Sequence, residues 1–227
     1  MSRAQQPLTG DSSVGLSDEA RWGSVLVRVV WLAILLGLAM ETLLLLLAAG
    51  FEILPSFGSA ITDLMGKVSW SALVCAGLAV GTALSKARTS LMGLMGLLAA
   101  PLAFNVSRAL QQGLANTLEA AAAGASVGSQ TLILLAIIKA VEYGCLGVAV
   151  GWLGRRPWGG VLTHAAAGLA VGIVFGGTIV GFTYLSTPEL LSTADLLSRG
   201  INEIIFPVGC ALVLYTATAF GERVGRR

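Results

Sequence analysis

Long apolar runs, separated by shorter polar segments, dominate the pattern of this chain. A hydrocarbon core of about 30 Å is crossed by about 20 apolar residues in helical form. The runs predict helices at about residues 24–50, 67–85, 90–108, 131–153, 160–184 and 201–220. The sequence therefore predicts an all-α fold: a polytopic integral membrane protein built as a six-transmembrane-helix bundle.

The N-terminal segment differs from the rest of the chain. Residues 1–16 are polar and rich in Ser and Gly, which predicts a disordered cytoplasmic tail before a membrane domain at 17–227. Ser17 is an expected helix cap, because the acidic residues that follow it favour the positive end of a helix dipole.

The connections between the runs differ in length on the two sides. One set is tight, whereas the other is longer and amphipathic. In the last of the longer ones, Thr187 to Gly200 has the cap, proline and glycine signals of a short interfacial helix on the outer face. Pro55 to Lys67 is a weaker example. Ala109 to Gln130 either extends the third helix or folds back into the bilayer.

Composition narrows the class of protein. The chain is 56% hydrophobic and 11% charged, with a mean hydropathy of +0.84. Soluble domains carry about 25% charged residues, so little of this chain is expected outside the bilayer. The net charge is +2, and no basic cluster is interleaved with aromatic residues, so nucleic acid is not an expected partner.

The Lys and Arg residues indicate the orientation. Nine belong to the tail, to the second–third and fourth–fifth connections or to the C-terminus, whereas the alternate connections hold three. The nine are Arg3, Arg21, Lys86, Arg88, Arg155, Arg156, Arg223, Arg226 and Arg227, and the three are Lys67, Arg108 and Arg199. Cytoplasmic loops carry an excess of Lys and Arg. The pattern predicts a multi-pass protein of the cell membrane with both termini cytoplasmic.

A short sequence recurs in the even-numbered spans. The segment Cys75 to Gly81 matches Cys145 to Gly151, and Cys210 lies at a similar position in the last span. The period is about one hairpin, which predicts three repeated helical hairpins with their cysteines at comparable depth. The alternative is that spans rich in Gly, Ala and Val match by composition alone.

Ionisable residues within the apolar runs are the candidate functional residues. Each costs at least about 2.5–3.5 kcal/mol at the centre of a bilayer, so such residues usually serve a pathway, a partner or helix pairing. The candidates for an ion or proton path are Glu41, Asn105, Arg108, Lys139, Glu142 and Glu203.

These candidates differ in their expected partners. Lys139 and Glu142 are three residues apart, so they share a helix face and can neutralise each other. Glu41 has no such local partner and is expected to meet Arg108 or Lys139, or to be protonated. Its role stays open between an ion or proton path, a structural bond between helices and a misplaced span.

Glycines recur at helical spacing in three spans. Such faces let helix backbones approach closely, and the alternative is that they thin the wall of a pore. The predicted packing positions are Gly77, Gly81, Gly144, Gly147, Gly151, Gly168, Gly172 and Gly176.

Other chemistry has little support in the sequence. The single histidine, His164, has no Cys or carboxylate at metal-ligand spacing, and each cysteine falls within an apolar run. No nucleophile-elbow, zinc-protease or phosphate-loop motif is present. No metal, cofactor or enzymatic activity is therefore expected.

Two functions are consistent with these features. The first is a transporter or channel for a small ion or proton that uses the buried charged residues. The alternative is a non-catalytic integral subunit or assembly factor of a larger membrane complex. Expected partners are the lipid bilayer and either further copies of the chain or other membrane subunits.

Overall fold

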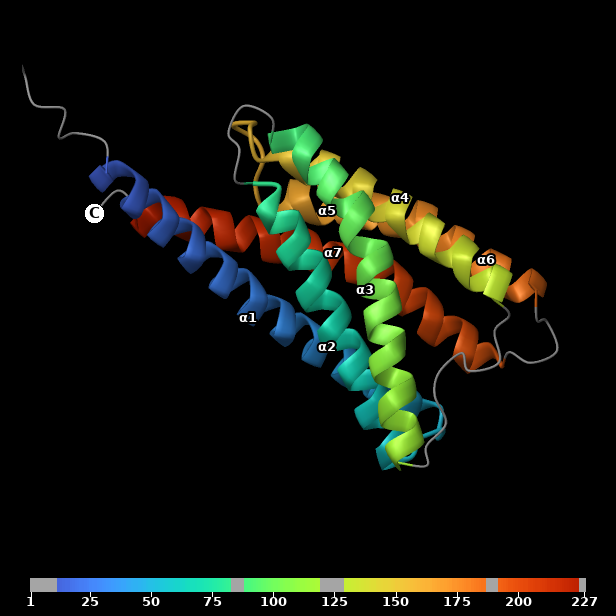
Figure 1. Ribbon diagram of the computed structural model, residues 1–227. Coiled ribbons are helices and arrows are strands. Elements are labelled where there is room, and N and C mark those ends of the chain that lie inside the picture. Colours follow the sequence, from blue (N-terminus) through green and yellow to red (C-terminus); the bar gives the residue numbers. More distant parts are fainter. Residues whose placement is uncertain (1–11, 83–87, 119–128, 187–191, 225–227) are drawn as a thin grey trace, which may run out of the picture.

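The computed structural model describes residues 12–82, 88–118, 129–186 and 192–224, and the regular structure within these ranges is helical (Figure 1). The helices are α1 (Ser12–Gly50), α2 (Phe57–Val80), α3 (Arg88–Leu118), α4 (Ser129–Leu153), α5 (Val161–Val171), the π-helical segment η1 (Gly172–Gly176), α6 (Gly177–Ser186) and α7 (Thr193–Val224). The elements α5, η1 and α6 follow one another without a break.

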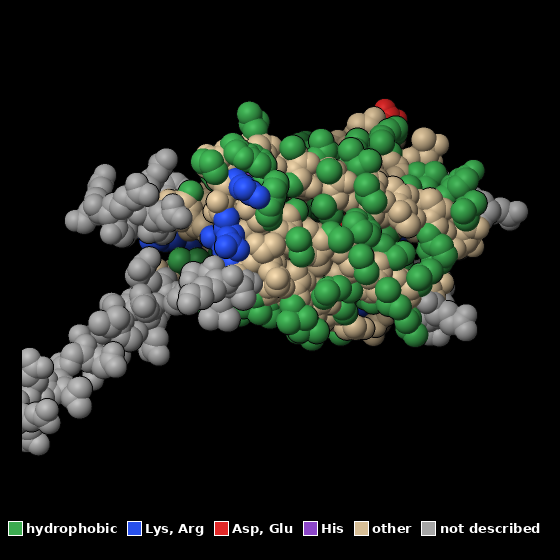
Figure 2. Space-filling view, turned by 90° about the horizontal axis from the view of Figure 1, so that it is seen from above, with side chains coloured by type: hydrophobic (Ala, Val, Ile, Leu, Met, Phe, Trp, Pro, Cys, Tyr) green, Lys and Arg blue, Asp and Glu red, His purple; other side chains and the backbone are tan. Residues whose placement is uncertain are grey.

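Six helical stretches of the described residues are long and apolar enough to cross a membrane. They are Gly23–Gly50, Phe57–Val80, Arg88–Leu118, Thr131–Leu153, Val161–Ser186 and Thr193–Ala219. Their outward surfaces are apolar too, since Leu162 is 84% exposed and Leu185 is 79% exposed. Hydrophobic side chains cover much of the face seen in Figure 2. Such a surface is suited to lipid rather than to water.

The helices form a bundle in which α7 has the most neighbours. Along the chain, α1 packs against α2, α2 against α3 and α3 against α4. Helix α7 packs against α1 and α5 and also touches α2 and α4, so it closes the bundle.

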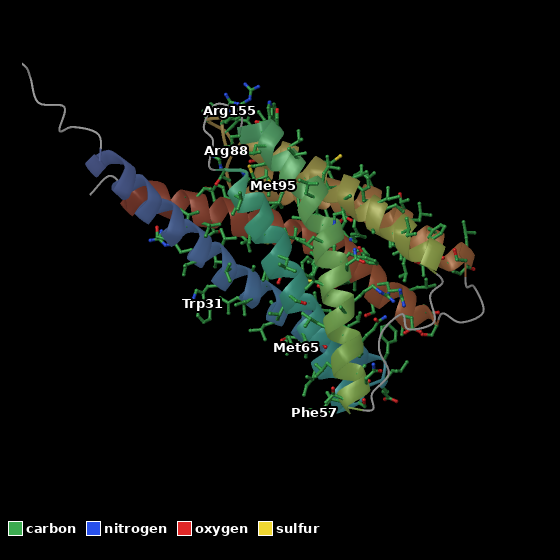
Figure 3. The ribbon with its side chains drawn as sticks, in the orientation of Figure 1. Trp31, Phe57, Met65, Arg88, Met95 and Arg155 are labelled. Atoms are coloured by element: carbon green, nitrogen blue, oxygen red, sulfur yellow. The ribbon has the colours of Figure 1, made fainter. Side chains whose placement is uncertain are left out.

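The start of α1 and the end of α7 lie at the same end of the bundle, which we call the terminal end (Figure 1). Figure 3 shows Arg88 and Arg155 near this end and Phe57 at the opposite end.

Several of the largest buried apolar side chains lie towards the terminal end. Leu78 near the end of α2, Met92 near the start of α3 and Leu146 in the second half of α4 are fully buried. Leu214, in the second half of α7, is 2% exposed.

The eight glycines proposed for packing all lie against a neighbouring helix. A methyl group placed on Gly81 would lie 2.6 Å from the Cα of Met92, and one on Gly168 would lie 2.6 Å from the Cα of Val208. Larger residues would therefore separate these helices.

The outer connections differ from the prediction. Helix α2 begins at Phe57, where Ser56 accepts a hydrogen bond from the Ser59 N–H at 3.2 Å, so Pro55 to Lys67 is not a separate interfacial helix. Helix α7 begins at Thr193 and continues through Gly200 into the last span. Ser192 and Asp195 start it by exchanging hydrogen bonds between side chain and backbone, each at 3.1 Å.

The physical reason is that the signals within these segments mark helix starts rather than helix ends. A glycine inside a long apolar helix keeps its backbone hydrogen bonds, which cannot be replaced by water in a bilayer. Residues 187–191 of the predicted interfacial helix lie outside the described residues.

Two further boundaries also move. Helix α1 begins at Ser12, so the last residues of the predicted tail are helical and Ser17 lies inside a helix. Helix α3 extends to Leu118, which is the first of the two alternatives for its outer end, whereas residues 119–128 lie outside the described residues.

The three cysteines of the predicted repeat have different surroundings. The sulfurs of Cys75 and Cys210 are 3.5 Å apart and buried between α2 and α7, whereas Cys145 is exposed on α4. The first two therefore lie at the same level of the bundle. The threefold repeat stays a prediction.

Candidate functional site

Three charged side chains from α4 and α7 meet inside the bundle. Lys139 donates a hydrogen bond from its Nζ to Glu203 Oε2, and the same Nζ lies 2.8 Å from Glu142 Oε2. Glu142 has no exposed surface, and the side chains of Lys139 and Glu203 are 11% and 17% exposed. We call Lys139, Glu142 and Glu203 the buried charge cluster. Helix α4 supplies two of its members because residues three apart share a helix face.

Two aromatic rings border the ammonium of Lys139. Its Nζ lies 5.8 Å from the ring centroid of Trp70 on α2 and 5.7 Å from that of Tyr143 on α4. The two rings contact each other edge to face, with centroids 5.6 Å apart. An ammonium near aromatic faces is attracted by the negative charge of the ring faces. The rings therefore help to fix the cation between the carboxylates.

The buried charge cluster has one negative charge in excess. With ordinary ionisation it holds one cation and two anions. Glu142 Oε2 lies next to the Lys139 ammonium, whereas the buried Glu142 Oε1 has no hydrogen-bond partner among the described residues. The Oδ1 of Asn202, next to Glu203, is in the same situation. Buried oxygens without donors are costly, so this part of the bundle is suited to a proton or another positively charged species.

The backbone around Glu203 is irregular. Pro207 has no N–H, so the carbonyl of Glu203, four residues earlier, lacks its usual helical donor. The π-helical segment η1 packs on the same level, where a methyl group on Gly176 would lie 2.9 Å from Glu203 Cβ. Such π-helical turns within α-helices are often found at functional sites.

Polar groups continue from the buried charge cluster towards the terminal end. The Nε1 of Trp70 donates to the hydroxyl of Tyr143 at 3.4 Å, and Cys210 lies within hydrogen-bonding reach of Tyr143. The thiols of Cys75 and Cys210 end this line of polar groups. Beyond them lies the apolar core around Leu78 and Leu214.

Glu41 belongs to a separate ion pair. Its Oε2 accepts a hydrogen bond from Lys67 Nζ at 2.6 Å, between α1 and α2. The partner is therefore neither Arg108 nor Lys139, and Lys67 lies within α2 rather than in a connection. Asp63 and Arg199 add one charge of each sign nearby. This arrangement matches the structural alternative for Glu41, a bond between helices.

Asn105 and Arg108 line a groove on the outside of the bundle. The groove lies between α3 and α4 and has a volume of about 550 Å³. Asn105 is exposed and donates its amide to the Pro101 carbonyl at 2.8 Å, and the guanidinium of Arg108 lies 5.9 Å from the ring centroid of Phe104. The six candidates therefore do not converge on one site, and only Lys139, Glu142 and Glu203 come together.

Sequence reasoning missed Lys67, Trp70 and Tyr143 as members of these sites. A signal for Lys67 exists, because Glu41 and Lys67 lie thirteen residues before and after Leu54, at the turn between α1 and α2. Residues equally far from the turn of an antiparallel hairpin face each other. Trp70 and Tyr143 have no comparable signal in a chain rich in apolar residues.

His164 is a packed residue at the start of α5. Its ring Nδ1 lies 2.9 Å from the Gly160 carbonyl oxygen, and its ring centroid lies 4.9 Å from that of Tyr215. Across the described part of the chain, no group of three His, Cys, Asp or Glu side chains is arranged to hold a metal ion.

Comparison with known proteins gives no family assignment. The chain shows no significant match to protein-family models, to curated proteins or to solved structures. A functional proposal therefore rests on the sequence, the fold and the contacts described above.

Proposed function

We propose that this chain is a multi-pass protein of the cell membrane that transports or conducts a small ion or proton through the buried charge cluster. The observation that carries the proposal is the position of Lys139 between two carboxylates in the interior of the bundle. Ionisable residues that face the interior of a membrane bundle commonly mark ion and proton pathways.

The surroundings of the buried charge cluster support a pathway more than a purely structural bond. A structural ion pair needs one anion for its cation, whereas here two carboxylates share one ammonium, and the buried Glu142 Oε1 has no hydrogen-bond donor among the described residues. Pro207 interrupts the hydrogen bonding of α7 one turn after Glu203, and the neighbouring segment η1 is π-helical. The backbone near Glu203 is therefore not held by regular α-helical hydrogen bonds throughout. Irregular backbone at membrane depth is tolerated where it lines a cavity or is covered by protein.

The orientation proposed for the bundle places the terminal end in the cytoplasm. Lys and Arg side chains gather towards this end in Figure 2, in agreement with the nine cations of the tail, the tight connections and the C-terminus. The buried charge cluster then lies in the outer half of the bundle, and the apolar core around Leu78 lies between it and the cytoplasm. The described conformation would thus be closed on the cytoplasmic side.

A flux experiment tests this proposal. The purified protein is placed in lipid vesicles, and fluxes of H⁺, Na⁺, K⁺ and Cl⁻ are measured under imposed gradients with and without a membrane potential. We expect a flux of at least one of these ions above that of empty vesicles. Glu142→Gln, which keeps the shape and removes the charge, should lower it at least about tenfold. The matched control is Glu52→Gln, which makes the same change at an exposed residue.

Two results would contradict the transport proposal. One is a wild-type flux equal to that of empty vesicles for all four ions. The other is a Glu142→Gln protein that folds and transports like the wild type.

A second function, an integral subunit of a larger complex, is favoured by one observation. A second groove, of about 890 Å³, adjoins the first along the exposed face of α3 and α4. Both grooves are lined by Leu97 and Val141, so they form one apolar face. If this is the function, gentle purification should recover a fixed set of other polypeptides, and Leu94→Ala, at a half-exposed residue of the second groove, should release them.

A further inference from the structure

We propose that the buried charge cluster is a proton-binding site, in which one proton is taken up by the two carboxylates while the Lys139 ammonium stays between them. This inference rests on the proposed function for its role in transport. It goes beyond the proposed function by naming the bound species as a proton.

The place that a metal cation would take is already occupied. The Nζ of Lys139 contacts the carboxylates of both Glu142 and Glu203. Hard cations need a shell of several oxygen ligands; Ca²⁺, for example, takes six to eight. A metal cation between these carboxylates would have to displace an ammonium held by two ion pairs, whereas a proton needs only one carboxylate oxygen.

The aromatic side chains that line the site also favour an ammonium group. Trp70 and Tyr143 present rings at 5.8 and 5.7 Å from the Lys139 nitrogen. Aromatic rings attract cations by their faces but offer few oxygen ligands in place of the water around a small metal ion. These rings therefore favour a fixed ammonium over an exchanging Na⁺ or K⁺.

One added proton makes the buried charge cluster neutral. Two carboxylates and one ammonium leave a charge of −1, and a buried charge without compensation is costly. Adding H⁺ from water to a Glu203 oxygen forms an O–H bond and makes the cluster neutral, and Lys139 then keeps its ion pair with Glu142. Transfer of that proton to Glu142 breaks this O–H bond and forms another, and Lys139 then pairs with Glu203. No bond to the nitrogen changes, and no other reactant is needed.

The other groups that face Glu142 do not compete for this role. Lys139 and Tyr143 share α4 with it, α7 contributes Glu203 and Cys210, and α2 contributes Cys75 through its contact with Cys210. Phenols and thiols are ordinarily neutral near pH 7, so the carboxylates are the groups that exchange a proton. The two carboxylates also differ in access, because Glu142 has no exposed surface and the Glu203 side chain is 17% exposed. Glu203 is therefore the entry and exit position.

Infrared difference spectroscopy tests the inference without requiring flux. The full-length protein in lipid is titrated with acid, and the C=O stretch of protonated carboxyl groups is followed. Acid protonates the exposed carboxyl groups too, so the band has several components. We expect one component of the wild-type band to be lost in Glu142→Gln or in Glu203→Gln and retained in Glu52→Gln. The band should titrate at the same pH in choline, Na⁺ and K⁺ salts.

The outcomes separate this inference from the proposed function. No titrating band that is sensitive to Glu142 or Glu203 would overturn proton binding. A titration that shifts when Na⁺ or K⁺ replaces choline would overturn it too, because a metal cation would then share the site, although transport could still hold. A titrating band without flux of any ion would support proton binding and refute transport. Should both glutamine variants fail to fold, Glu203→Asp keeps a carboxyl group and should shift the same component of the band, and an unshifted band would overturn the inference.

Discussion

The half of the bundle near the terminal end is packed from apolar side chains, whereas the other half encloses two groups of charges. Leu78, Met92 and Leu146 are fully buried in the first half. The second half contains the Glu41–Lys67 pair and the buried charge cluster. Lipid surrounds both halves in the proposed arrangement, so the difference lies in what each half encloses.

The two halves differ in the interactions that they contain and in the charge balance of those interactions. Apolar side chains and glycine contacts fill the first half, whereas the second half adds buried charges to such packing. The Glu41–Lys67 pair balances its own charge, whereas the buried charge cluster does not. This imbalance separates a structural pair from a candidate functional site.

The largest effect is expected from removing the cation of the buried charge cluster. Lys139→Met leaves two buried carboxylates without a partner and should lower the free energy of unfolding by about 3–5 kcal/mol. Unfolding in mixed detergent micelles measures this loss. The triple variant with Glu142→Gln and Glu203→Gln should recover most of it, because the cluster is neutral again. A single variant as stable as the wild type would show that these charges are not buried together.

A somewhat smaller effect is expected in the apolar half. Leu214→Ala creates a cavity at a residue that is 2% exposed and should cost about 2–4 kcal/mol. The matched control is Leu162→Ala, at a residue that is 84% exposed, with an expected change within about 0.5 kcal/mol. Equal losses at both positions in the same unfolding assay would contradict the packing described for this half.

The structural pair should contribute less than either. Glu41→Gln leaves Lys67 without its carboxylate, but the Lys67 side chain is 17% exposed and can turn its ammonium towards the membrane surface. We expect a loss of about 1.5–3 kcal/mol, the usual range for a hydrogen bond to a charged group. Adding Lys67→Met should cost little more, because the two residues act as one pair. Additive losses in this double-mutant cycle would show that the pair does not form.

The smallest effect on stability is expected at Asn105, in the groove between α3 and α4 that Arg108 also lines. Asn105 is exposed and hydrogen-bonds only within its own helix among the contacts described, so Asn105→Ala should change the free energy of unfolding by less than about 0.5 kcal/mol. Flux should also stay at the wild-type level. A large loss of flux would return this residue to the pathway that the sequence suggested.

The sequence predicts six spans because apolar length alone decides them, and six helices of sufficient length and apolarity are found in the described residues. It misjudges the outer connections, because Ser56 and Ser192 start long helices that pass through Lys67 and Gly200. Caps are local signals, but the length of the helix that follows a cap depends on packing.

Only some contacts of the candidate site can be predicted from the sequence. The Lys139–Glu142 contact follows from helical spacing, and the Glu41–Lys67 contact follows from the symmetry of a hairpin. The contact of Lys139 with Glu203 joins residues 64 positions apart. Predicting it requires knowledge that α4 and α7 are neighbours, which no local pattern of residues contains.

In the proposed mechanism the buried charge cluster lies on the ion path, whereas the Glu41–Lys67 pair does not. Flux in vesicles that contain equal amounts of folded Glu142→Gln or Glu41→Gln protein distinguishes the two sites. We expect Glu142→Gln to lower the flux at least about tenfold and Glu41→Gln to leave it within about twofold of the wild type, because only the first removes a charge from the cluster. Loss of flux in Glu41→Gln with normal flux in Glu142→Gln would show that the path runs through the pair instead.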